Sequence, residues 1–502
     1  MAGSASHPTR LRSSRLARWY GALPRRGQTS VEVVSVLLGA PLVGFLVYAP
    51  LAFLAPPVLE VVFWVIWGSL VATAILIAME YARANRFPEP PLPEAPGDDQ
   101  LPALATVIAA YLPNEEATLM DSLRAHLALD YPHDKHLVVL AYNSPVSLPI
   151  EADLADLAAA DGRFVSLKVA GSTSKVENLE AALALVGDRV EVVGIFDADH
   201  HPHPTAGRRV LQWLGDGAGE ERFDVVQGQC MIRNVDESAV TRTVAAEFAT
   251  LYAVAHPGRT VVNDFGIFGG SNGWWRASVI TRLGLDRTRL TEDIDVTARA
   301  LAAGYRLGTD PRIISSELAP ATWSALWRQR VRWSQGWLEV SLAHLPRLMA
   351  TSRLSAVQRR GVALLFGWRI LHPWIATQML PLVLAMSLVP GRDISWLLLF
   401  FLVSSIGVNG IPILQAIAGH RLAPPGIAGR TGLFTRFALI SLVFYAEYRA
   451  VANRGAVVRH LLGASTWDVT ARTGARSPGA PAERRTTGSR LAGAQVAALE
   501  AS

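Results

Sequence analysis

The chain has 502 residues, half of them hydrophobic, which allows one large domain with several further helices and is typical of a protein partly embedded in a membrane. The formal net charge is only +5, and the basic excess lies at the two ends of the chain, so it gives no reason to expect a nucleic-acid partner. A single cysteine, Cys230, excludes an intramolecular disulfide, which fits a reducing compartment.

Two apolar segments near the N-terminus are each long enough to cross a bilayer. Residues 1–30 are polar and basic, and the apolar runs Val33–Leu54 and Val58–Met79 follow, divided by two prolines. A hydrocarbon core of ~30 Å needs ~20 helical residues, and the first run is too long for a secretory signal peptide. Because arginines flank the pair, the positive-inside rule predicts a cytoplasmic N-terminus, two transmembrane helices within residues 31–80 and a cytoplasmic segment after them.

The centre of the chain has the pattern of an α/β domain. A linker rich in proline and acidic residues covers residues 81–102, and residues 103–345 then alternate short β-branched runs with helical stretches. This alternation predicts crossover connections and a mostly parallel sheet. The runs expected to form strands are Ala105–Ala110, His136–Ala141, Phe164–Val169, Val190–Phe196 and Phe223–Gln227.

Apolar segments return within residues 361–452. Val362–Leu388 and Ile394–Ala418 are long enough for two more spans. Phe437–Tyr445 is shorter and flanked by charged residues, so both an interfacial helix and a further span remain open for it. The tail, residues 453–502, is basic, and a cytoplasmic tail requires an even number of spans. We therefore expect four spans and one interfacial helix.

A first motif places two carboxylates at the end of an apolar run. Asp197 and Asp199 follow the run that ends at Phe196, and residues two apart on a strand point the same way. At the carboxyl edge of a parallel sheet such a pair suits Mg²⁺ or Mn²⁺ held against a diphosphate. The alternative is a pair of turn aspartates beside the histidines that follow.

A second motif joins a threonine to a pair of acids. Thr291, Glu292 and Asp293 precede a helical stretch. The pattern is typical of a helix cap. It equally suits a general base, with Asp293 accepting a proton from an attacking hydroxyl.

A third motif lies on a predicted helix. Gln329, Arg332 and Trp333 have the spacing i, i+3, i+4 and share one helix face. An amide and a guanidinium can bind phosphate oxygens, and an indole can stack on a sugar ring. An amphipathic helix at a membrane surface would show the same pattern.

These three motifs, in this order inside an α/β domain bracketed by apolar segments, resemble the inverting family-two glycosyltransferases, such as the cellulose, chitin and hyaluronan synthases. The resemblance covers residues 100–345. It implies a GT-A domain, a Rossmann-like fold for nucleotide-diphospho-sugar transfer, on the cytoplasmic side of an α-helical transmembrane bundle. It also implies Mg²⁺ or Mn²⁺ as a cofactor.

Three further segments resemble loops of the same family. Residues 111–116 resemble the loop that holds the nucleobase and ribose, residues 175–179 the lysine–asparagine loop near the diphosphate, and residues 269–276 the glycine–serine loop beside the acceptor. The second aspartate pair of many relatives is missing here, where Asn143 or main-chain groups are expected to contact the base. Residues 467–472 resemble the gating loop of processive synthases.

The resemblance implies a role for each matched residue. Asp293 is the general base. The nucleotide-binding residues are Tyr111, Asn114, Glu115, Lys175, Asp197, Gln329 and Arg332. The acceptor-binding residues are Trp333, Glu292 and Ser271, and the metal-binding residues are Asp197 and Asp199.

The sequence therefore predicts an inverting hexosyltransferase of a multi-pass cell membrane protein. It would move a hexose from a nucleotide-diphosphate sugar, a UDP-sugar foremost, to a growing β-linked polysaccharide. The alternative is transfer of single sugars to a lipid-linked acceptor. A catalytically dead scaffold is disfavoured because every matched catalytic position is filled. The sugar, the linkage and a need for accessory subunits remain open.

Overall fold

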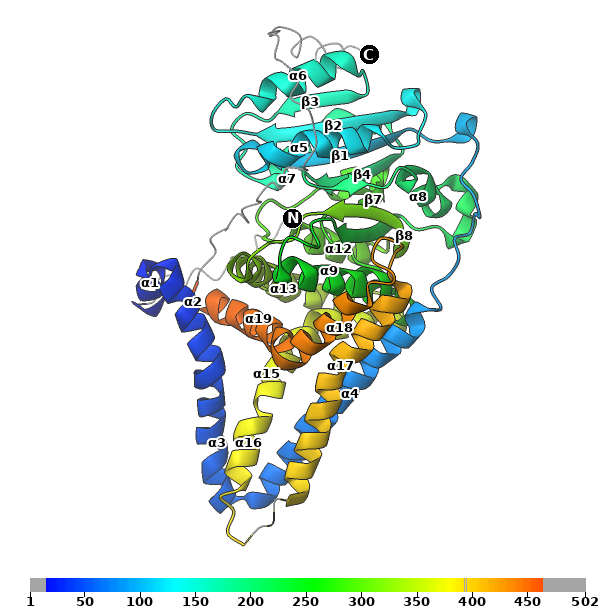
Figure 1. Cartoon of the computed structure of the whole chain (residues 1–502). Coiled ribbons are helices and arrows are strands. Elements are labelled where there is room, and N and C mark those ends of the chain that lie inside the picture. The colour runs from blue at the N-terminus through cyan, green and yellow to red at the C-terminus, as the bar shows by residue number, and fades with distance from the viewer. Residues whose placement is uncertain (1–14, 392, 394, 464–502) are drawn as a thin grey trace.

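The computed structural model describes residues 15–391, 393 and 395–463, of which residues 218, 220, 221, 404–409 and 412 are described by their backbone alone. Figure 1 shows three regions. A sheet with helices on both faces forms one end, several helices lie across its base, and long helices extend away from it. The predicted gating loop at residues 467–472 lies outside the described residues.

One eight-stranded sheet forms the α/β region, in the order β3-β2-β1-β4-β7-β6-β8-β5. Neighbours within β3-β2-β1-β4 are parallel, as are β6 and β8, whereas β7 runs antiparallel to β4 and β6, and β5 to β8. The strands are β1 (Leu104–Tyr111), β2 (His136–Asn143), β3 (Phe164–Lys168), β4 (Val192–Asp197), β5 (His201–Pro202), β6 (Val225–Ile232), β7 (Gly273–Arg276) and β8 (Leu307–Glu317). The predicted α/β class and mostly parallel sheet are confirmed.

Side chains of alternate residues on each strand enter two separate cores. On β1, Ala105, Val107 and Ala109 pack on the face that carries α7 (Lys175–Val186), while Leu104 and Ile108 pack on the opposite face. Strands buried on both faces need continuous apolar sequence, which explains the uninterrupted runs seen in the sequence. The other helices on the sheet are α5 (Leu112–Leu127), α6 (Ile150–Ala160), α8 (Ala206–Leu214), α11 (Ala277–Leu283) and α12 (Glu292–Ala303).

All five strands expected from sequence are present, but β5, β7 and β8 were missed. β7 falls in the predicted glycine–serine loop and has four residues, of which Trp274 and Trp275 are fully buried. β8 contains Pro311 and polar residues, and its register against β6 shifts beside Gly228. A short strand and an interrupted strand both lack the regular apolar pattern that signals a strand.

Helices from the centre and the C-terminal part of the chain lie across the base of the sheet (Figure 1). They are α9 (Ala239–Thr250), η7 (Leu251–Ala255), α10 (His256–Asn263), α13 (Trp323–Ala350), α14 (Ala356–Val362), η8 (Ala363–Trp368), α18 (Thr431–Ile440), η9 (Ser441–Tyr445) and α19 (Ala446–Leu461). The segment Phe437–Tyr445, for which an interfacial helix and a further span were both open, is the middle of the continuous run α18-η9-α19.

Long helices extend from this layer. They are α2 (Arg25–Val34), η2 (Ser35–Gly39), α3 (Ala40–Leu54), α4 (Pro56–Ala84), α15 (Arg369–Thr377), α16 (Met379–Met386) and α17 (Ser395–Leu422). Among the described residues, two helices are long and apolar enough to cross a membrane, Arg25–Leu54 and Pro56–Ala84. Leu54, Val65, Leu384 and Trp396 are examples of apolar side chains that stay largely exposed on α3, α4, α16 and α17.

The remaining elements are short. They are α1 (Arg15–Ala22), η3 (Asp98–Gln100), η4 (His133–Lys135), η5 (Gly187–Arg189) and η6 (Asp216–Glu221).

Candidate active site

The centre of the candidate site is the ammonium group of Lys175. Lys175 is the first residue of α7, whose N-terminus is capped by Ser174. Its Nζ lies 2.7 Å from Asp197 Oδ1 and 3.1 Å from Glu292 Oε1, and donates a hydrogen bond of 3.0 Å to the carbonyl oxygen of Gly270. Burial opposes the charge, but Asp197 and Glu292 outweigh it and raise the pKa of Lys175. One cation therefore joins the end of β4, the start of α12 and the glycine–serine loop.

The glycine–serine loop lies between β4 and Asp293. Gly270 has φ of +88°, and a Cβ atom there would lie 3.0 Å from Asp293 Oδ2. Ser271 Oγ accepts a hydrogen bond of 3.0 Å from the backbone N–H of Asp197. Only glycine meets both the conformation and the close approach at position 270.

Asp293 lies in the first turn of α12 with its pKa raised to about 7. Burial is the largest cause, the charge of Glu292 adds to it, and Lys175 opposes both. A base is most effective when its pKa lies near the working pH. Thr291 occupies the N-cap position of α12, as the alternative interpretation predicted, but its side chain makes no cap hydrogen bond.

The two aspartates of the first motif differ in their surroundings. β4 ends at Asp197, so Asp199 lies beyond the strand in a turn, and the expectation that both share one strand face is wrong. Asp197 is partly exposed, whereas Asp199 is fully buried and its Oδ2 accepts a hydrogen bond of 3.0 Å from the N–H of Leu318. Carboxylate oxygens are the ligands that Mg²⁺ and Mn²⁺ prefer, so the chemistry of this donor pair fits such an ion.

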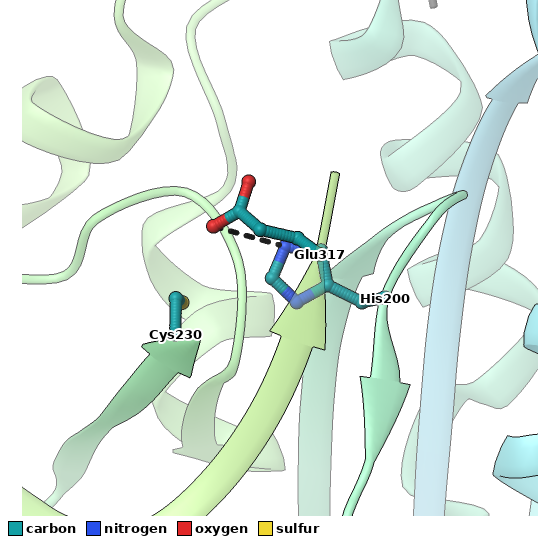
Figure 2. Close-up of side chains that lie close together, drawn as sticks. All are labelled: His200, Cys230 and Glu317. Atoms are coloured by element: carbon teal, nitrogen blue, oxygen red, sulfur yellow. Dashed lines mark ion pairs between the residues drawn. The ribbon is translucent and has the colours of Figure 1, made fainter. Parts of the chain in front are cut away.

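Beside Asp199 lies a group of side chains that sequence analysis missed (Figure 2). The ligand atoms of His200, Cys230 and Glu317 lie within 4.8 Å of one another. His200 Nδ1 is 3.0 Å from Ser315 Oγ, and His200 Nε2 is 3.7 Å from Glu317 Oε1. Only the position of His200, directly after Asp199, could have indicated the group from sequence.

Each side chain of this group also has a partner outside it. Cys230 Sγ donates to the Ser271 carbonyl oxygen at 3.8 Å, and burial raises the pKa of the Cys230 thiol well above its usual range. Arg233 donates to the carbonyl oxygens of Asp199 and Ser316 and interacts electrostatically with Glu317. These residues therefore support the turn that carries Asp199.

The third motif lies on α13, as the helical spacing predicted. Gln329, Arg332 and Trp333 are all partly buried in its first half. The backbone of α13 passes very close to the second motif, since a Cβ atom at Gly336 would lie 2.3 Å from Thr291 Cγ2. The two motifs are therefore on helices in direct contact.

The two segments expected as nucleotide loops contain the starts of helices, α5 at Leu112 and α7 at Lys175. Tyr111 ends β1 with its side chain exposed, Asn114 and Glu115 are in the first turn of α5, and Glu115 Oε2 accepts a hydrogen bond of 3.1 Å from the N–H of Tyr111. Asn143 donates to the Ser172 carbonyl oxygen at 3.0 Å and accepts from Asn178 at 2.8 Å. Asn143 thus holds the segment that leads to Lys175.

Comparison with known proteins identifies the region around these motifs. The sequence model of Glycosyl transferase family group 2 matches residues 192–406. The chain contains a family-two glycosyltransferase domain. The match includes Asp197, Glu292, Asp293 and the α13 motif, whereas Tyr111 and Lys175 precede it.

Relatives of this glycosyltransferase domain occur in bacteria. The probable glycosyltransferase YdaM of Bacillus subtilis and a poly-beta-1,6-N-acetyl-D-glucosamine synthase of Staphylococcus epidermidis are each 26% identical over 257 residues, which is 51% of this chain and 60% of the relative. The chain thus spans about three fifths of the length of these relatives. Among solved structures, a Pyrobaculum calidifontis mannosyltransferase, PcManGT, is 19% identical with a TM-score of 0.49, covering 76% of this chain and 99% of that one.

The mixed sheet of the glycosyltransferase domain agrees with the GT-A-like fold that the resemblance implied. Its parallel half, β3-β2-β1-β4, ends at the edge where Tyr111 and Asp197 lie, and the antiparallel strand β7 follows. Ligands of open α/β sheets bind at this carboxyl edge. The fold therefore brings the first two motifs to the edge where a nucleotide is expected.

Proposed function

We propose that this domain transfers a hexose, with inversion, from a nucleotide-diphosphate sugar to a growing β-linked polysaccharide at the cytoplasmic side of a membrane. UDP-sugar is the proposed donor. The observation that carries the proposal is the joining of Lys175, Asp197, Glu292 and Asp293 in one cluster, with the pKa of Asp293 at about 7. This arrangement supplies a cation for a leaving diphosphate and a base for an acceptor hydroxyl.

In the proposed reaction, Asp293 removes the proton from the acceptor hydroxyl as its oxygen attacks the anomeric carbon. The bond between that carbon and the diphosphate breaks on the opposite face, so an α-linked donor gives a β-linked product. Lys175, Gln329 and Arg332 stabilise the charge on the departing diphosphate. Asp197 and Asp199 would hold Mg²⁺ or Mn²⁺, which neutralises part of that charge.

The remaining site residues would orient the two substrates. Tyr111 ends β1, and Asn114 and Glu115 lie in the first turn of α5, on the donor side of the cluster. Glu292 and Ser271 contact Lys175 and the backbone of Asp197 respectively, next to the base. Trp333 would provide the surface on which the acceptor sugar stacks.

The membrane part of the proposal rests on the long helices. Two of them have the length and composition of spans, and α16 and α17 also expose large apolar side chains, including Leu384 and Trp396. A soluble protein seldom exposes so much contiguous apolar surface. We propose that residues 31–80 and 361–452 hold four spans, with the domain at residues 103–345 on the cytoplasmic side.

Polysaccharide is the proposed product because the curated relatives include poly-beta-1,6-N-acetyl-D-glucosamine synthases. The test is product analysis with the purified chain in lipid, Mg²⁺ or Mn²⁺ and separate radiolabelled nucleotide sugars. A high-mass, β-linked polymer from one donor is expected. Label confined to short, lipid-extractable species would indicate transfer of single sugars instead of polymer synthesis. No transfer from any donor would refute the proposal.

A further inference from the structure

Arg330 is a buried residue that lies within the third motif but is not one of the three residues that define it. It lies on α13, three residues before Trp333, and its side chain is nearly inaccessible. The guanidinium carbon lies 4.4 Å from the centroid of the Trp333 ring and 5.8 Å from that of Phe248 on α9. A guanidinium stacked on an indole at this distance restricts how the indole can turn.

The position of Arg330 is fixed by Glu247, which comes from α9. Arg330 donates a hydrogen bond of 2.5 Å to Glu247 Oε2, and both side chains are more than nine-tenths buried. Burial favours the neutral form of Glu247, but Arg330 and Arg449 outweigh it and hold its pKa below the usual range. The pair is therefore ionic at neutral pH.

Glu247 also contacts the C-terminal helices. Tyr445, the last residue of η9, donates a hydrogen bond of 2.6 Å to Glu247 Oε2, and a guanidinium nitrogen of Arg449 on α19 lies 3.4 Å from Glu247 Oε1. One carboxylate thus joins α9, α13, η9 and α19. Hydrogen bonds to a buried carboxylate are directional, so each partner constrains the others.

The first turns of α13 contact α19 a second time through aromatic side chains. The rings of Trp323 and Trp327 lie 5.4 Å and 5.3 Å from the ring of Tyr448, whose hydroxyl donates to the Trp323 carbonyl oxygen at 2.7 Å. A shift of η9 and α19 would therefore displace the half of α13 that carries Trp333.

We propose that Glu247 is a positioning residue for the acceptor site: through Arg330 it holds the Trp333 indole in place and links it to η9 and α19. This inference rests on the proposed function, in which Trp333 contacts the acceptor sugar. A residue that acts in this way affects acceptor binding and leaves donor binding nearly unchanged. A residue that only stabilises the fold affects both alike, or neither.

The test compares Glu247→Gln with Glu80→Gln. Glu80 on α4 accepts two hydrogen bonds, of 3.2 and 3.1 Å, from Arg259 on α10, so it is also in a largely buried pair, and within the described part of the chain neither residue has a hydrogen bond or ion pair to α13. The assay measures KM for the donor and for a soluble acceptor, with cellobiose and N,N′-diacetylchitobiose as the two probes. We expect Glu247→Gln to raise the acceptor KM about tenfold and to leave the donor KM within about twofold, and Glu80→Gln to change neither.

Hydrogen exchange of residues 323–337 and 441–449 provides a readout that does not need activity. Glu247→Gln should lose protection in both segments together, whereas Glu80→Gln should lose it in neither. Unchanged exchange after Glu247→Gln, or equal rises of the two KM values, would overturn the inference. Failure of the wild-type chain to transfer sugar would refute the proposed function and with it the acceptor role of Glu247, while the exchange result would still decide the link between the helices.

Discussion

The pH dependence of transfer should depend on the two charges beside Asp293. Its pKa is raised from 3.8 to about 7, which corresponds to about 4 kcal/mol against the carboxylate. Burial is the largest cause, and Glu292 adds to it while Lys175 opposes it. A base must be unprotonated, so kcat/KM should fall as the pH drops below about 7.

Two substitutions should move this acid limb, the fall of kcat/KM at low pH, in opposite directions. Glu292→Gln removes a negative neighbour, so the pKa of Asp293 should fall and activity should persist to lower pH. Lys175→Met removes a positive neighbour, so the pKa should rise and the limb should move to higher pH. A single nearby charge changes a carboxyl pKa by about one to three, so each shift should exceed about one pH unit.

The assay measures kcat/KM for the donor across about pH 5 to 9, because this ratio reports the pKa values of the free enzyme. Glu180→Gln, which removes an exposed charge on α7, is the control and should leave the limb in place. An unchanged limb in Glu292→Gln, or shifts of both variants in the same direction, would refute the electrostatic reasoning.

Three further predictions concern single parts of the site. Gly270→Ala should lower kcat at least tenfold, because alanine is strained at φ of +88° and its Cβ would crowd Asp293. The control is Gly429→Ala, at φ of +82° with nothing within 4 Å, which should change stability alone. Equal kcat values in these two variants would contradict this prediction. Trp333→Ala should raise the acceptor KM at least tenfold and leave the dissociation constant for UDP unchanged, and equal losses in both would indicate that Trp333 only packs. Removal of divalent metal with EDTA should abolish transfer and added Mg²⁺ or Mn²⁺ should restore it, with Asp197→Asn requiring more metal for half-maximal rate; full activity in EDTA would exclude the metal.

The sequence predicted those parts of the fold that depend on local pattern. β1 and β4 were found because both are continuous apolar runs that are buried on both faces. β7 and β8 were missed because pairing with their neighbours, rather than their own composition, makes them strands. The segments expected as loops, residues 111–116 and 175–179, contain the starts of the helices α5 and α7.

The residues of the candidate site also divide into those that the sequence indicated and those that it did not. Local patterns made Asp197, Asp293 and Arg332 candidates, and the resemblance of the ordered motifs to family-two glycosyltransferases implied their roles. The Glu247–Arg330 pair joins residues 83 positions apart, and no local pattern marks such a partner. The burial of Asp199 could not be predicted either, because the N–H that binds it belongs to Leu318, the residue after β8 and 119 positions away.

The most direct test of the account separates transfer from donor binding in Asp293→Asn. Asparagine keeps the size of the side chain but cannot accept the proton, so the account predicts a loss of transfer of at least about a thousandfold. Binding of UDP, measured by calorimetry in Mg²⁺ or Mn²⁺, should stay within about threefold of the wild type. Transfer near the wild-type rate in Asp293→Asn would contradict the central claim that Asp293 is the base.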